Sequence, residues 1–210
     1  MKKHKNSDGW INEGSPHYHY YPLEALLFTA NAVKCRGIRL FDRDLHDMFV
    51  EPVKGTYPDL SFPAHSDGWY GANLLSQSAL YEIADARYND PLLKRVLELT
   101  YAQKKRLDPE ALLNNQTISV SDENMIQQSY SFAASGFCLL RSDARTVVLK
   151  FGGEGIGHGH PDKLSITIHD GKNELVSDFG TSGYGVPDYL KWYKRSLSHN
   201  TVTVDAKDQK

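Results

Sequence analysis

The sequence predicts an α+β fold in which helices come first and antiparallel strands follow. Apolar residues recur with a helical period in the first half of the 210 residues, whereas short β-branched runs between glycine turns fill the part after about residue 128. Helices followed by strands are typical of an α+β arrangement or of two domains in sequence. We expect a helical domain over 1–115, a linker over 116–128 and a strand domain over 129–210.

Three helices are expected in the first half. Their sequences are PLEALLFTANAVKC from Pro22, ANLLSQSALYEIADARY from Ala72, and DPLLKRVLELTYAQKK, which starts with an Asp90 cap. The long connection EPVKGTYPDLSFPAHSDGWYG separates the first two helices. A connection of this length in a compact domain is usually functional or packed by its own side chains.

Four strands are expected in the second half, namely RTVVLKF, KLSITIH, ELVSDFG and NTVTVDA. In KLSITIH the apolar residues share one face and the polar residues share the other. This alternation is typical of an antiparallel strand with one face buried.

Composition excludes some classes and leaves others open. A net charge of −2 gives no reason to expect a nucleic-acid partner. No apolar run approaches the roughly 20 residues of a membrane span, and the basic start MKKHKNSDGWINEGS has no apolar segment of the kind signal peptides carry. Twelve tyrosines and three tryptophans suit a carbohydrate cleft, but they are equally common in β-rich cores. Cys35 and Cys138 lie in different halves, so a disulfide is possible but unsupported.

The stretch GEGIGHGHPDKLSI places His158 and His160 two residues apart among glycines. Glycine is tolerated where the backbone takes unusual angles, and imidazole is a common metal ligand and acid–base group. A solvated glycine turn that carries histidine by chance is the alternative.

Asp178 and His199 follow at spacings that would let neighbouring strand ends converge on one ion. Nitrogen and oxygen donors suit zinc, with manganese or calcium as weaker candidates. Alternatively, Asp178 caps a turn and His199 is a hydrogen-bonded sheet residue.

Together with their neighbours, these residues match a known pattern. SGFCLLRSD, GHGHPDKLSITIHDGKNELVSDFGTSGYG and YKRSLSHNTVTVDAKDQ resemble the C-terminal part of the heparinase II/III-like family, most strongly its alginate-lyase and oligoalginate-lyase branches. Upstream, WINEGSPHYHYYPLEALL and YPDLSFPAHSDG resemble two further segments of that family. Ala206 departs from the pattern, which has glycine in this turn.

The resemblance implies an α/α toroid packed against an antiparallel β-sandwich. Residues up to about 115 would be the last helices of the toroid, and 129–210 would open the sandwich. The chain would then be a fragment of a longer lyase, with little or no elimination activity by itself. The full-length protein would be periplasmic, in the cell envelope or secreted, although no signal peptide is visible in this chain.

The resemblance also implies the cleavage of uronate-containing polysaccharides, alginate or glycosaminoglycan-like, by β-elimination. The metal ligands, for Zn²⁺ or another divalent ion, would be His160, Asp178 and His199. The catalytic candidates are Tyr18, with Tyr20 as the other possible register, and His158, which would face the cleft. The substrate-binding candidates are Glu13, His19 and Arg195.

Two other classes remain open from sequence. A cupin-like metal oxygenase also uses a His-x-His pair with a later histidine, but it usually has a glutamate about four residues on, where this chain has PDKLS. A non-catalytic, metal-stabilised carbohydrate-binding module is the third. The sequence does not select among uronate polymers or between endo and exo action.

Overall fold

Helices and a single antiparallel sheet make up the computed structural model, which describes residues 4–114, 117–118, 128–152 and 156–210. The α-helices all precede the strands, and two short helical turns, Tyr189–Tyr193 and Ser196–Ser198, follow them, so the predicted α+β class is confirmed. Most of the predicted linker at 116–128 lies outside the described residues.

The described part of the first half contains five α-helices. They are α1 (Pro16–Val33), α2 (Arg43–Lys54), α3 (Ser78–Tyr88), α4 (Pro91–Gln103) and α5 (Pro109–Asn114). Helix α1 begins before the predicted Pro22, because Ser15 is extended and Pro16 takes the first helical position. Helix α2 was not predicted, although Asp42 caps it by accepting a hydrogen bond from Leu45 N at 2.9 Å.

The sheet contains five strands in sequential order, each antiparallel to the next. They are β1 (Tyr130–Phe132), β2 (Phe137–Arg141), β3 (Thr146–Lys150), β4 (Ser165–His169) and β5 (Glu174–Val176). The predicted strand over NTVTVDA does not form; this segment makes an isolated bridge between Val204 and Lys207. Asp205 and Ala206 lie between them at φ +54°, a left-handed conformation that favours the glycine expected there.

Strand β4 alternates as predicted, but its polar face is the buried one. Ser165, Thr167 and His169 are buried, whereas Ile166 is 40% exposed. The hydroxyls of Thr167 and Tyr57 are 2.6 Å apart, and the His169 ring stacks on Tyr57 at 4.5 Å. The strand therefore turns its hydrogen-bonding side chains toward the helical half of the chain.

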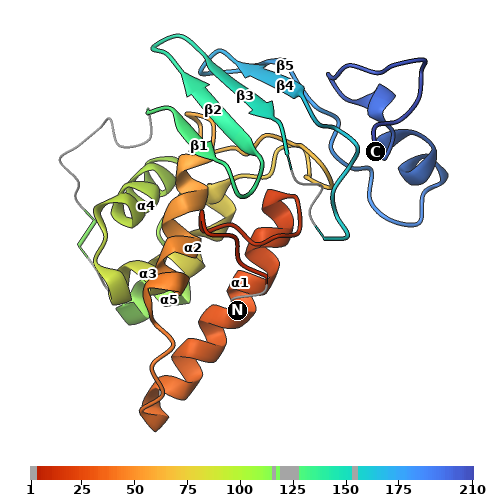
Figure 1. The fold of residues 1–210 in the computed structure, drawn as a ribbon. Coiled ribbons are helices and arrows are strands. Elements are labelled where there is room, and N and C mark those ends of the chain that lie inside the picture. Colours follow the sequence, from red (N-terminus) through yellow and green to blue (C-terminus); the bar gives the residue numbers. More distant parts are fainter. Residues whose placement is uncertain (1–3, 115–116, 119–127, 153–155) are drawn as a thin grey trace.

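The helices and the sheet share one hydrophobic core, and the sheet lies across one end of the helical layer (Figure 1). Trp10 packs edge-on against Phe62 from the long connection and against Phe132 and Phe137 from the sheet. Arg141 at the end of β2 bonds to carbonyls at the C-terminal end of α2 and just beyond it. Because the two halves are packed together around one core, they are not separated into two bodies that would mark a boundary, and the predicted domain boundary stays a prediction. Within the described part of the chain, no helix has the length and apolar character that crossing a membrane requires.

Candidate active site

The long connection between α2 and α3 carries a buried carboxylate, Asp67, to the edge of the sheet. The backbone N–H of Asp67 donates to the carbonyl of His158 at 3.0 Å. Gly180, two residues after Asp178, packs against the Asp67 loop with φ +59°. A Cβ at this glycine would lie 2.0 Å from the carbonyl oxygen of Gly68. Because no side chain fits at that approach, the glycine lets the chain after Asp178 lie against the Asp67 loop.

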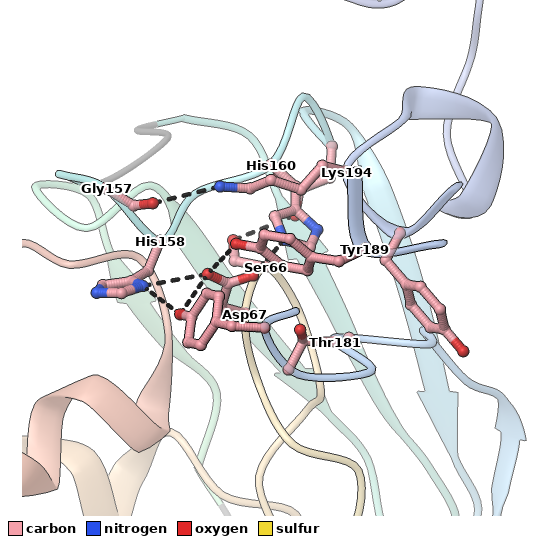
Figure 2. Close-up of polar contacts among 12 residues, drawn as sticks. Ser66, Asp67, Gly157, His158, His160, Thr181, Tyr189 and Lys194 are labelled. Carbon is pink, nitrogen blue, oxygen red and sulfur yellow. Dashed lines mark hydrogen bonds and ion pairs between the residues drawn. The ribbon is translucent and has the colours of Figure 1, made fainter. Parts of the chain in front are cut away.

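Asp67 is the centre of a hydrogen-bonded cluster (Figure 2). Its Oδ1 accepts from His160 Nε2 at 2.7 Å, and its Oδ2 accepts from the Tyr184 and Tyr189 hydroxyls at 3.0 and 2.9 Å. His158 Nδ1 lies 3.1 Å from the same Oδ2. Burial alone would raise the pKa of Asp67, but the hydrogen bonds from His160, Tyr189 and His158 outweigh it and lower the pKa to about 2. Asp67 is therefore an anion at neutral pH.

Tyr18, His158 and Tyr184 meet on the solvent side of Asp67. The Tyr18 ring lies flat on the His158 ring, with 3.5 Å between centroids and 4° between planes. The Tyr184 hydroxyl is 2.5 Å from the Tyr18 hydroxyl and 2.8 Å from His158 Nδ1. Burial, together with hydrogen bonds to Tyr18 and Asp67, raises the pKa of Tyr184, so this phenol holds its proton. The predicted substrate-binding residue Glu13 lies 3.5 Å from the other nitrogen of His158.

The three predicted metal ligands lie together behind this surface. His160 Nδ1 and His199 Nε2 face one another at 3.2 Å. The outer nitrogen of His160 is bonded to Asp67, and His199 Nδ1 is within 3.0 Å of both carboxylate oxygens of Asp178. If each outer nitrogen donates to its carboxylate, both inner nitrogens are acceptors that face each other. One positive charge between them, a shared proton or a metal ion, would satisfy both.

The fit to zinc is therefore partial. An N···N distance near 3.3 Å follows from tetrahedral Zn–N bonds of about 2.0–2.1 Å, so the two imidazoles suit such an ion. Asp178 is on the opposite side of His199 and supports that ring instead of facing the same point. Among the described residues, no group of three His, Cys, Asp or Glu side chains is arranged to hold a metal ion. The zinc site stays a prediction.

A buried ion pair supports the Asp67 loop from below. Lys150 on β3 bonds to Ser66 Oγ at 2.5 Å and to Asp162, and both charged side chains are almost fully buried. Ser66 has φ +57°, an unusual angle for a serine. The ion pair therefore fixes the strained residue that directly precedes Asp67.

The structure places two of the predicted site residues, His19 and Tyr20, in the core. His19 is fully buried: its Nδ1 accepts from Ile11 N at 3.1 Å and its Nε2 lies 2.8 Å from Met48 O, so it is a core residue and does not reach substrate. Tyr20 is also in the core, bonded to the Tyr81 hydroxyl at 2.9 Å, because it lies on the opposite side of α1 from the site. Arg195 is exposed and pairs with Asp208, and its substrate-binding role stays a prediction.

Several residues of the cluster were missed from sequence. Asp67 lies in the segment AHSDGW, where the length of the connection and the family resemblance indicate a functional segment but do not single out the carboxylate. Tyr184 and Tyr189 follow Asp178 in GTSGYGVPDY and had no distinguishing spacing. Lys194, next to the predicted Arg195, is the cation that reaches the histidine loop, since its Nζ donates to Gly157 O at 3.3 Å (Figure 2).

Comparisons of the sequence identify its relatives. Residues 126–210 match the family described as Heparinase II/III-like, C-terminal. An alginate lyase from Stenotrophomonas maltophilia (strain K279a) is 28% identical over 227 aligned positions, which cover 94% of this chain and 30% of the relative. A heparin-sulfate lyase from Bacteroides stercoris is 24% identical over 214 positions, covering 96% of this chain and 29% of the relative. The chain thus spans about a third of the length of these relatives.

Solved structures agree with this result at the level of the fold. A heparan sulfate lyase from Pedobacter heparinus superposes with a TM-score of 0.75 at 19% identity, over 99% of this chain and 32% of that one. A heparinase III structure gives a TM-score of 0.72 at 18% identity, over 99% and 34%. The predicted resemblance to the heparinase II/III-like lyases is confirmed, and the proteins related to this chain are polysaccharide lyases.

Proposed function

We propose that this chain, related to the heparinase II/III-like polysaccharide lyases, provides part of an active site that cleaves a uronate-containing polysaccharide by β-elimination. The observation that carries the proposal is the contact of two phenol hydroxyls, from Tyr18 and Tyr184, beside the imidazole of His158. These groups can move a proton and stabilise a negative charge at one place on the surface.

Elimination requires two proton transfers. A base removes the proton on C5 of the uronate, the electron pair forms the C4=C5 double bond, and the C4–O4 bond breaks as O4 receives a proton. Tyr18 is our candidate donor to O4, because its hydroxyl reaches the cluster surface and its ring is fixed by stacking on His158. The Tyr184 hydroxyl is bonded to that hydroxyl and holds it in position.

The substrate carboxylate must be neutralised before C5 loses its proton, because the developing carbanion would otherwise add charge to charge. His158 presents its outer nitrogen toward Glu13 and solvent, and Lys194 stands beside it at Gly157. We assign carboxylate binding to His158 and Lys194, with Lys194 taking the role predicted for Arg195. One donor of this kind is worth roughly 3 kcal/mol in a water-poor site.

A metal ion between His160 and His199, if present, would have a positioning role. It would fix two segments of chain, and its charge would hold the cluster at Asp67 in order. The proton transfers proposed above do not involve this ion. Alginate and glycosaminoglycan-like chains remain the candidate substrates, and a periplasmic or envelope location of the full-length protein remains a prediction.

The test is turnover of a panel of uronate polysaccharides, followed by the near-ultraviolet absorbance of the new double bond. Tyr18→Phe should lower the rate by at least about 100-fold, because a proton donor is lost while the ring and its stacking remain. Tyr20→Phe is the matched control, and it should retain turnover because its hydroxyl bonds within the core. An active Tyr18→Phe protein would contradict the assignment.

The same panel separates the other classes. Oxygen consumption without unsaturated products would favour the cupin-like oxygenase. Sugar binding that gives no product and is indifferent to Tyr18→Phe would favour a non-catalytic carbohydrate-binding module. Because this chain spans about a third of its relatives, the panel should be run with it and with longer forms of the protein.

A further inference from the structure

A pocket next to the Tyr18 cluster has no role in the proposed elimination. Its volume is about 340 Å³, within the range typical of small-molecule sites. The residues that line it come from the start of α1, from the long connection and from the 3-10 turn before α3. They include His17, Tyr20, Phe62, Trp69, Ser76 and Gln77.

Trp69 forms one wall of the pocket and is held in place although it is 41% exposed. The His17 ring meets it edge-on, with 6.2 Å between centroids. On another side Gly183 approaches so closely that a Cβ there would lie 3.1 Å from the indole ring. An exposed indole fixed between two neighbours is a ready surface for an apolar ring face, because little side-chain freedom is lost when a ligand stacks on it.

The same contacts fix the position of the pocket relative to the reactive groups. His17 directly precedes Tyr18, and their rings are 5.1 Å apart. Gly183 directly precedes Tyr184. Trp69 therefore lies between His17 and Gly183, the neighbours of Tyr18 and Tyr184 in the chain. A ligand stacked on the Trp69 ring would lie about one sugar unit from Tyr18.

The chemistry of the lining identifies the kind of ligand. The described residues around the pocket include neither a lysine or arginine nor a carboxylate. The Gln77 amide donates one hydrogen to Ser76 Oγ at 3.1 Å, and a primary amide also carries a second hydrogen and a carbonyl oxygen. Aromatic rings together with amide and hydroxyl groups suit the C–H face and the hydroxyls of a pyranose. A carboxylate or sulfate would meet no lysine or arginine there, and burial lowers the pKa of His17, which favours its neutral ring.

We propose that this pocket is the subsite for the sugar unit that adjoins the uronate at Tyr18, and that it binds this unit as an uncharged pyranose ring stacked on Trp69. The identity of the neighbouring unit rests on the proposed function. The substrate is then recognised in two ways, by charge at His158 and Lys194 and by stacking and hydrogen bonds at Trp69. Any carboxylate on the second unit points away from the pocket.

The test is calorimetric titration with two probes, an alginate tetrasaccharide and its carboxyl-reduced counterpart, in which every uronate has become a neutral hexose. A Tyr18→Phe background prevents turnover during the titration. Trp69→Ala should weaken the binding of both probes by a similar factor, about tenfold. That factor should persist at high salt, because no charge is involved.

Tyr70→Ala is the matched control, since Tyr70 is the next residue, is 68% exposed and does not line this pocket. It should change both affinities by less than about twofold. Trp69→Phe should keep most of the binding, which separates a stacking role from a folding defect. Gln77→Ala removes the lining amide without adding a charge and should affect the two probes equally.

Three results would overturn the proposal. They are equal losses from Trp69→Ala and Tyr70→Ala, a Trp69→Ala loss confined to the charged probe, or a Gln77→Ala loss confined to it. Failure of the proposed function is a separate outcome. If Trp69→Ala weakens sugar binding but the wild type forms no unsaturated product, the subsite is retained and the lyase assignment is contradicted. If the wild type forms the product but Trp69→Ala leaves binding unchanged, only the subsite is contradicted.

Discussion

Replacing Asp67 with asparagine tests whether the cluster depends on one buried negative charge. The wild-type carboxylate receives four hydrogen bonds from side chains, which come from His158, His160, Tyr184 and Tyr189. Asparagine keeps the shape but has one oxygen and no charge. Its best orientation turns the amide nitrogen to His160, which must then accept a hydrogen bond through Nε2.

The expected cost follows from the difference between charged and neutral hydrogen bonds. Bonds to a charged group contribute about 1.5–3 kcal/mol each and neutral ones about 0.5–1.5 kcal/mol, so four weakened bonds lose about 4–6 kcal/mol. Relief from burying a charge offsets part of this loss, which leaves about 3 kcal/mol. For a chain of this size, that lowers the Tm by about 6–12 °C.

The assay is thermal unfolding at neutral pH, where Asp67 is ionised because its pKa is lowered to about 2. Asp170→Asn is the matched control: Asp170 accepts from the backbone N–H of Lys172 and Asn173 in the turn after β4, and asparagine can do the same. We expect the control to melt like the wild type. If Asp67→Asn also melts like the wild type, the four-bond cluster is not a stabilising unit and our description of the site is wrong.

Three further predictions concern the surroundings of the site. Gly180→Ala should destabilise the protein severely, because the added Cβ would lie 2.0 Å from the carbonyl oxygen of Gly68. Gly185→Ala is the control: a Cβ there meets nothing within 4 Å, so this variant should lower the Tm much less. Similar Tm values for the two variants would refute the packing argument. Burial lowers the pKa of His19 to about 4, so the folded state favours the neutral ring. Its contribution is fully present above the unfolded pKa of about 6.5 and is lost as the pH falls toward 4. Urea unfolding at a series of pH values should show this loss, and a His19→Gln protein with an unchanged pH slope would contradict it. Elemental analysis should find zinc that a His160→Ala protein lacks, and a metal-free wild type would indicate that a shared proton joins the imidazoles instead.

The sequence predicted the parts of the fold that depend on local pattern. The Asp90 cap and the helix after it were predicted correctly, as were β3 and β4, because capping and side-chain alternation are properties of a few neighbouring residues. Helix α2 was missed although it has a cap at Asp42: residues 36–50 are assigned to no element from sequence, and only the last turn of α2 falls in the long connection, which starts at Glu51. The segment from Asn200 has the β-branched composition of a strand, yet it pairs with no named strand.

The inward face of β4 was decided by the tertiary structure. Alternation indicates that Ile166 and Thr167 point to opposite sides, but it does not show which side is covered. Thr167 is buried because Tyr57, from the long connection, supplies a hydroxyl partner, so the polar side of the strand is compatible with burial.

The sequence by itself determined that His158, His160, Asp178 and His199 form a set, because their order and spacing match a family pattern. Only the tertiary structure placed Tyr18 and not Tyr20 in the site: the two are two residues apart on one helix, so the side of α1 that meets His158 selects between them. The same is true of Asp67 and Tyr184. Asp67 lies 91 positions from His158, and Tyr184 lies 166 positions from Tyr18. Local periodicity carries no information at such separations, and these groups meet because the helices and the sheet pack around one core that leaves their ends side by side.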